Sequence, residues 1–220
     1  MSKEKDYIGN ITDAERRFFE APVTIEMREA GDADKPSVIE GYAFKFNRTT
    51  TIADFFREEI LPGSADDVLQ DDVRCLFNHN PNFVLARSNN GEGTLKLSLD
   101  EVGLKYRYET PNVSYAKDLE ESIRLGNVSQ SSFAFGIDEQ RWVEREGELP
   151  LRQIVKFKRL YDVSPVTYPA YQDTSVAKRS LEAFSTENSK DIEVNTGNAS
   201  EKDEQKKRTV RNAQCVIYNY

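Results

Sequence analysis

The sequence predicts an α+β fold that is mostly antiparallel β-structure, with a β-barrel as the expected arrangement and a few helices around it. Most of the hydrophobic pattern between residues 21 and 184 has a period of two, which is typical of strands. Two segments interrupt this pattern with helical signals, and neither an internal repeat nor a βαβ alternation occurs. A chain of 220 residues with 38% hydrophobic side chains is long enough to bury one core.

The strands follow from alternation along the chain. Val23, Ile25 and Met27 alternate with polar residues, and a second run over 37–46 contains Phe44 and Phe46 on either side of a lysine. Further strands are predicted at VRCLFN (73–78), TLKLSLD (94–100), GLKYRYE (103–109), GNVSQSSFAFGI (126–137) and RLYDVSPVTYPAY (159–171), with a turn at NGEG (90–93).

These two segments predict helices, and a third helix is expected near the end of the domain. In PGSADDVLQ, Ser64 is an expected N-cap, followed by two aspartates in the first turn of a short helix. Residues 114–126 have Leu119 and Ile123 four positions apart and end at Gly126, a favourable residue just beyond a helix. A third helix is expected at TSVAKRSLEAF, residues 174–184.

Composition divides the chain into three parts. Residues 1–20 form a charged lead-in that we expect to be loosely docked, and residues 21–184 form the folded domain. Residues 185–220 are rich in Ser, Asn, Glu and Lys and contain too few apolar side chains to offset the entropy of ordering. We therefore expect a disordered C-terminal tail.

The composition also argues against several classes of protein. A net charge of −8 disfavours nucleic acid and anionic lipid as partners. No apolar run approaches a membrane span, and the N-terminus lacks the shape of a signal peptide. Two distant cysteines, Cys75 and Cys215, fit a reducing cytoplasm rather than a disulfide framework, and with a single histidine they cannot form a Cys/His zinc site. We expect neither a metal nor another cofactor.

Candidate catalytic residues occur in the predicted strand at 126–137 and directly after the predicted strand at 73–78. Ser129, Ser131 and Ser132 fall within four positions, but a serine is a useful nucleophile only beside a base. His79 is the only histidine, and its unperturbed pKa suits that role near neutral pH. A strand whose hydroxyls pair with backbone or solvent is the structural alternative.

An aspartate offers a third member of such a site. Asp162 lies among apolar strand residues, where an unpaired buried carboxylate is costly, so a partner is expected. An aspartate in this position could orient the imidazole of a serine hydrolase. It could equally be a strand-end residue that faces solvent or caps a turn before Pro165.

Four stretches together resemble the prohead proteases of tailed bacteriophages, which are distant relatives of the herpesvirus assemblin proteases. IEGYAFKFN followed by FREEILPGSADDVL matches the opening of that domain, and VRCLFNHNP matches its histidine strand. GNVSQSSFAF is similar to the nucleophile segment, and LYDVSPVTYPAY to the third block. The resemblance covers about residues 21–184 and implies an assemblin-like β-barrel.

The resemblance implies roles for individual residues. His79 takes the general-base position, and Ser132, directly before Phe-Ala-Phe, takes the nucleophile position. Ser131 stands where the family often has Met, so it is the alternative nucleophile. Asp162 takes the third position, which family members fill with Glu or Asp; herpesvirus relatives use a second histidine there, which this chain lacks.

The resemblance also implies a function. Such enzymes act inside the assembling procapsid in the host cytoplasm, where they cleave the scaffolding segment of the major capsid protein, or a scaffold protein, and themselves. The tail from residue 185 is an expected self-cleavage target, and self-association is possible. The alternative is a catalytically silent scaffold or assembly protein on the same fold, and a weaker one is a barrel that binds a peptide.

Overall fold

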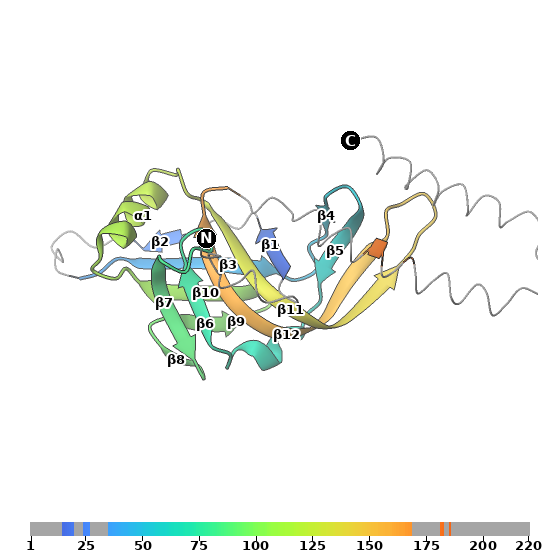
Figure 1. Cartoon of the computed structure of the whole chain (residues 1–220), viewed down its shortest axis with the longest axis horizontal. Helices are drawn as coiled ribbons and strands as arrows, with labels where there is room; N and C mark the ends of the chain where they lie inside the picture. The colour runs from blue at the N-terminus through green and yellow to red at the C-terminus, as the bar shows by residue number, and fades with distance from the viewer. Residues whose placement is uncertain (1–14, 20–23, 27–34, 169–180, 183–184, 186–220) are drawn as a thin grey trace, which may run out of the picture. The chain divides into compact units, whose positions relative to one another are not determined.

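The structure is a computed structural model that describes residues 15–19, 24–26, 35–168, 181–182 and 185. The described strands and helix α1 lie within the compact unit Met1–Arg179, and the strands form two sheets (Figure 1). The strands are β1 (Glu15–Phe19), β2 (Thr24–Glu26), β3 (Val38–Lys45), β4 (Thr50–Ile52), β5 (Phe56–Ile60), β6 (Val73–Leu76), β7 (Val84–Asn89), β8 (Glu92–Gly93), β9 (Lys96–Leu99), β10 (Gly103–Glu109), β11 (Gln130–Val143) and β12 (Leu151–Val166).

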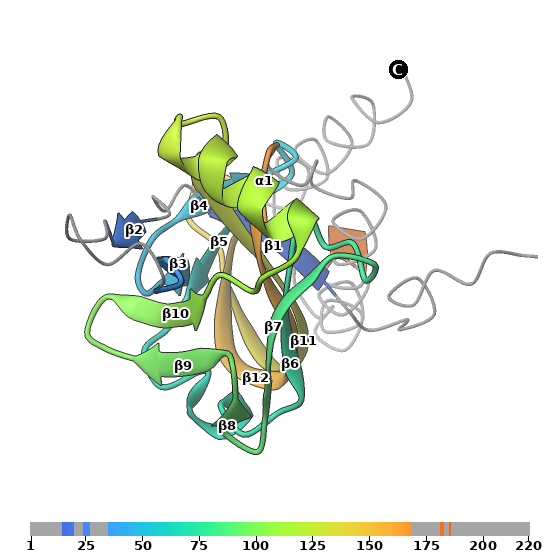
Figure 2. The ribbon, with the colours of Figure 1, turned by 90° about the vertical axis from the view of Figure 1, so that its left-hand side faces the viewer.

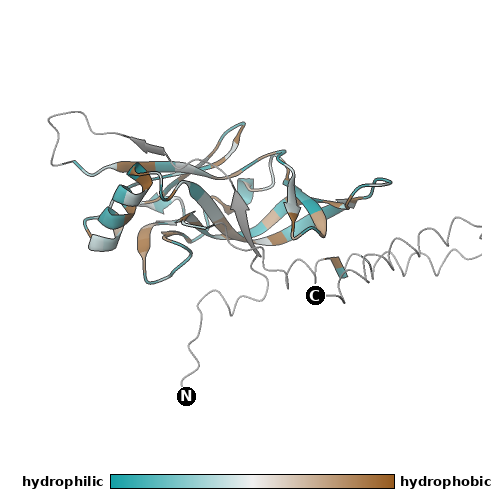
Figure 3. Cartoon of the chain, turned by 90° about the horizontal axis from the view of Figure 1, so that it is seen from above, coloured by the Kyte–Doolittle hydropathy of each residue, from teal (hydrophilic) through white to brown (hydrophobic). Residues whose placement is uncertain are grey.

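The larger sheet has the order β1-β11-β12-β6-β7-β8, with β5 also paired to β12 and β4 paired to β5. The smaller sheet has the order β2-β3-β10-β9. Most pairs are antiparallel, as predicted, but β12 runs parallel to both β5 and β6. The two longest strands, β11 and β12, form a hairpin whose connecting turn is hydrophilic (Figure 3).

The prediction of a closed barrel is wrong. Among the described residues no backbone pairing joins the two sheets, whose outer strands stay separate. Instead, the sheets bury a shared apolar layer between them, which removes water from the core without closing a ring. Figure 2 views the two sheets from the end where the helix lies.

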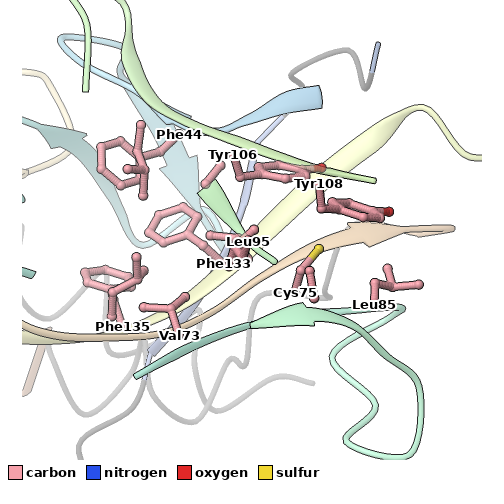
Figure 4. Close-up of a cluster of buried hydrophobic side chains, with 14 of the residues drawn as sticks. Phe44, Val73, Cys75, Leu85, Leu95, Tyr106, Tyr108, Phe133 and Phe135 are labelled. Atoms are coloured by element: carbon pink, nitrogen blue, oxygen red, sulfur yellow. The ribbon is translucent and has the colours of Figure 1, made fainter. Parts of the chain in front are cut away.

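Aromatic side chains from both sheets fill that layer (Figure 4). Phe44 of β3 contacts Phe133 of β11 and Phe157 of β12, with ring centroids 5.1 and 5.3 Å apart. Phe135 lies 4.6 Å from Phe157. Pairs at these separations add to the stabilisation from burying the rings themselves. The core therefore fixes β11 against β12 on the inner face of the larger sheet.

The two helices predicted within residues 62–126 have different outcomes. The helix predicted at 114–126 is confirmed as α1 (Ser114–Arg124), and Gly126 follows it with a φ of 77°. PGSADDVLQ forms a single 3₁₀ turn, η1 (Asp66–Val68), whose N-cap is Ala65 without a side-chain hydrogen bond. The expected Ser64 cap is wrong. Buried Ala65 and Val68 anchor this segment, so packing decides its conformation rather than capping.

Two other predictions meet the described residues only in part. The predicted helix at 174–184 and the predicted disordered tail lie outside them, apart from residues 181, 182 and 185, which are helical. Residues 15–19, expected in the loosely docked lead-in, instead form β1 at the edge of the larger sheet. The turn predicted at 90–93 is confirmed between β7 and β8, with positive φ at Asn90 and Gly91. No helix in the described segments is long and apolar enough to cross a membrane.

Candidate active site

Three side chains from separate segments form a continuous chain of hydrogen bonds. The Oγ atom of Ser132 lies 2.6 Å from Nε2 of His79, and Nδ1 of the same ring lies 2.6 Å from Oδ1 of Asp162. All three residues are buried. Because an ionised carboxylate can only accept hydrogen bonds, Nδ1 carries the ring proton of the neutral imidazole and Nε2 accepts from the serine hydroxyl.

The pairing of two strands positions the serine and the carboxylate. In the antiparallel register of β11 with β12, Ser132 is opposite Ser164, and Ala134 is opposite Asp162. Side chains two positions apart on a strand share a face, and directly paired residues share it as well. Ser132, Ser164 and Asp162 therefore lie on one face of the larger sheet, opposite the aromatic core.

A tight turn brings the histidine to that face. Asn78 and His79 follow β6 with φ values of 55° and 57°, and the N–H of Asn80 donates to the carbonyl of Phe77 at 3.1 Å. Positive φ at both central residues is the pattern of a type I′ turn. Each non-glycine residue held in this region costs about 1–3 kcal/mol unless its surroundings compensate, and such strain gathers at functional sites.

Asn78 supplies part of that compensation. Its N–H donates to the carbonyl of Pro165 at 3.1 Å, and its Oδ1 accepts from the N–H and the hydroxyl of Thr167, at 2.9 and 3.2 Å. Pro165 lies in β12, directly after Ser164, and Thr167 directly follows the last residue of that strand. The turn that carries the imidazole is thus attached to the strand that carries the carboxylate.

A second serine also contacts the carboxylate. The hydroxyl of Ser164 donates to Oδ1 of Asp162 at 2.7 Å, so this oxygen accepts from both Ser164 and His79. Both donors stabilise the ionised carboxylate in its buried position. Ser164 therefore helps to fix the carboxylate that orients the imidazole.

Ser131 lies on the other face of β11. Its Oγ atom is 2.8 Å from the hydroxyl of Tyr106 of β10, on the side of the aromatic core. Burial raises the pKa of Tyr106, so the phenol stays protonated and can donate to Ser131. The structure brings Ser132, His79 and Asp162 together, and it leaves Ser131 outside this group.

This arrangement can activate a hydroxyl as a nucleophile. The imidazole can take the proton of Ser132, and the carboxylate can stabilise the imidazolium that forms. The described residues contain no group of His, Cys, Asp and Glu side chains suited to holding a metal ion. What the arrangement offers is acid–base and nucleophilic chemistry by side chains.

Sequence reasoning missed Ser164, Asn78 and Tyr106. Asn78 directly precedes His79 in FNHNP, and Asn is favoured at positive φ, so a turn signal was available in the sequence. The contacts of Ser164 and Tyr106 follow from strand register, which local sequence does not give.

The free thiol of Cys75 lies close to this site but in the core. Cys75 is opposite Val163 in the parallel pairing of β6 with β12 and is fully buried. Burial, and secondarily the charge of Asp162, raise the pKa of the Cys75 thiol well above its usual range. Since the thiolate is the reactive form, this thiol should be inert in the folded protein.

We predict that iodoacetamide at pH 8 leaves Cys75 unmodified in the native protein and alkylates it fully in denaturant. Peptide mass spectrometry after a short treatment measures both forms. Rapid native alkylation of Cys75 would contradict its burial beside Asp162.

Comparisons with known proteins place the chain in a family. The model of the Caudovirus prohead serine protease family matches residues 23–189. The solved structure of the bacteriophage T4 capsid assembly protease matches with a TM-score of 0.45 and 13% sequence identity, covering 71% of this chain and 98% of that chain. No curated protein sequence gives a significant match. Since the family model spans most of the chain, this protein belongs to the Caudovirus prohead serine protease family.

Proposed function

We propose that the protein is a serine endopeptidase that cleaves the scaffolding segment of its phage's major capsid protein, or a scaffold protein, during prohead maturation. Membership of a serine protease family sets the reaction class. The observation that carries the assignment of residues is the hydrogen-bond chain from Ser132 through His79 to Asp162. A catalytically silent assembly protein would need neither these hydrogen bonds nor a histidine held in a strained turn.

In the proposed mechanism, Ser132 Oγ attacks the carbonyl carbon of the scissile peptide bond while Nε2 of His79 takes the hydroxyl proton. The imidazolium is stabilised through Nδ1–H and Asp162. His79 then returns the proton to the leaving amine as the C–N bond breaks, which leaves an acyl ester on Ser132. Water, deprotonated by the same imidazole, hydrolyses this ester and regenerates the serine.

The setting and a second substrate follow from the same proposal. The enzyme would act inside the procapsid, within the host cytoplasm, where capsid protein surrounds it. The polar tail from residue 185 resembles the accessible segments that proteases cut, so we propose that the chain also trims itself there.

Co-expression with the capsid protein of the same phage tests the function. We expect the unchanged chain to yield a shortened capsid protein and itself to lose mass from its C-terminus. Ser132→Ala should abolish both changes, because loss of a catalytic serine can cost about 10⁶-fold in kcat. Gels report the capsid band, and intact-mass measurement reports the tail.

Ser131→Ala is the matched control, since it removes a neighbouring hydroxyl that contacts Tyr106 rather than His79. Capsid processing should persist in this variant. Equal processing by the unchanged chain and by Ser132→Ala would refute the assignment of the nucleophile, and an uncut capsid protein with the unchanged chain would refute the proposed substrate.

Ser164→Ala tests the support of the carboxylate. We predict a loss of about tenfold or more in kcat/KM, since a hydrogen bond to a charged group contributes about 1.5–3 kcal/mol. The variant loses one of the two donors that hold Oδ1 of Asp162, so the imidazole that this oxygen orients is held less firmly.

The rate of capsid cleavage measures this effect. Ser164→Thr keeps a hydroxyl and should restore most of the activity, and Ser98→Ala, at an exposed position of β9, controls for serine loss elsewhere. A loss in Ser164→Thr as large as that in Ser164→Ala would leave Ser164 a packing role only.

A further inference from the structure

The proposed nucleophile is assembled but covered. Ser132 has a relative exposure of 0% and His79 of 8%, although the hydrogen bonds that would activate the serine are in place. A peptide carbonyl must approach Ser132 Oγ to within bonding distance for any reaction to occur. The described conformation therefore has to open beside Ser132 before a substrate can react.

The strand order shows on which side an opening is available. β12 flanks β11 on one side, and the turn that carries His79 is attached to the end of β12. The other side of β11 is covered by β1, the last strand of the sheet (Figure 1). A substrate approaching Ser132 from the side away from its base thus meets the backbone of β1.

The register places β1 directly at the nucleophile. Its five residues pair antiparallel with residues 131–135 of β11, and Phe18 is opposite Ser132. Among the described strands β1 pairs on one side only, as expected of an edge strand, so its release breaks a single ladder of that part of the structure. Short segments held in this way open more readily than the core of a sheet.

An exposed sheet edge is also a binding site for an extended peptide, through main-chain hydrogen bonds. Since β1 forms such bonds along residues 131–135, another extended segment could use the same edge after β1 leaves. The chemical class of ligand is an extended polypeptide backbone, which is the form in which an endopeptidase substrate presents its scissile bond.

We infer that residues 15–19 are an internal occupant of the substrate-binding edge of β11, so that the described structure is a latent form in which β1 excludes substrate from Ser132. This inference rests on the proposed function and adds how access to its site is controlled. Release of β1 exposes the edge, and an extended substrate segment takes its place.

A reversible crosslink in the full chain tests this inference. Arg16 and Ala134 are directly opposite each other in the register of β1 with β11. The Cα atoms of such pairs lie about 4.5–5.5 Å apart, within the range that a disulfide spans. The variant Arg16→Cys/Ala134→Cys, made with Cys215→Ser to avoid mispairing, would hold β1 in place when oxidised and release it when reduced.

The readout is the rate at which a small alkyl fluorophosphonate labels Ser132. In this reaction the Oγ–P bond forms, fluoride leaves with the P–F bond electrons, and the serine proton passes to His79. We expect labelling of the oxidised variant to be slower by about tenfold or more than that of the reduced variant, because the crosslink blocks local opening of the edge strand. Each single-cysteine variant, treated with the same oxidant, should show no such change.

Two proline variants give an independent measurement without a crosslink. Alternate N–H groups of an antiparallel edge strand point toward its neighbour, so one of residues 17 and 18 donates to β11 and the other points away. Of Arg17→Pro and Phe18→Pro, one should therefore label about fivefold or more faster than the unchanged chain, through loss of a ladder hydrogen bond, while the other stays close to it.

The outcomes separate this inference from the proposed function. Equal labelling rates of the oxidised and reduced crosslink variant would overturn the role of β1 while leaving Ser132 as nucleophile. If neither the unchanged chain nor any variant forms an adduct that Ser132→Ala abolishes, the proposed function fails and the inference fails with it.

Discussion

The antiparallel pairing of β11 with β12 is the constraint on which the rest of the site depends. It places Ser132 opposite Ser164, two residues beyond Asp162, without any contribution from loops. A shift of one residue in this register would turn Ser132 toward the core and Ser131 toward His79, because side chains alternate between faces. The aromatic rings of Phe133 and Phe157 on the inner face resist such a shift, since it would expose them.

The same pairing explains how a rigid sheet supports a strained turn. His79 is held in the left-handed region of backbone conformation, and the hydrogen bonds of Asn78 to Pro165 and Thr167 fasten that turn to β12. The carboxylate partner of the histidine comes from the strand to which its turn is fastened. The distance between His79 and Asp162 is thereby set by β12 and the turn fastened to it, and Ser132 reaches the imidazole from the neighbouring strand, β11.

Local sequence predicts much of this fold, because alternation and caps are local signals. The strands around Phe44, Cys75 and Phe133 and the helix ending before Gly126 follow from spacing alone. The closed barrel was predicted wrongly, since whether two outer strands pair depends on long-range geometry that alternation does not contain. β1 was missed for a related reason. ERRFF is charged at its start and has no alternating pattern of its own, and it forms a strand where β11 offers an edge.

The candidate site was predictable for a different reason. Having one histidine left a single possible base, and the family resemblance ordered the serines and the aspartate around it. From the sequence alone, Asp162 could either orient a histidine or face solvent at a strand end. The structure buries its side chain against His79 and Ser164. The latter contact, like that of Ser131 with Tyr106, depends on which residues face each other across strands, and no single segment contains that information.

The central claim is that His79 carries its proton on Nδ1, toward Asp162, and accepts from Ser132 at Nε2. Because the chain has one histidine, ¹⁵N-labelled histidine in protein purified without a polyhistidine tag gives one unambiguous imidazole NMR spectrum. At pH 8 the account predicts a protonated Nδ1 with a strongly downfield proton, an unprotonated Nε2, and loss of that proton signal in Asp162→Asn. A neutral ring protonated on Nε2 could not accept the proton of Ser132 and would contradict the account.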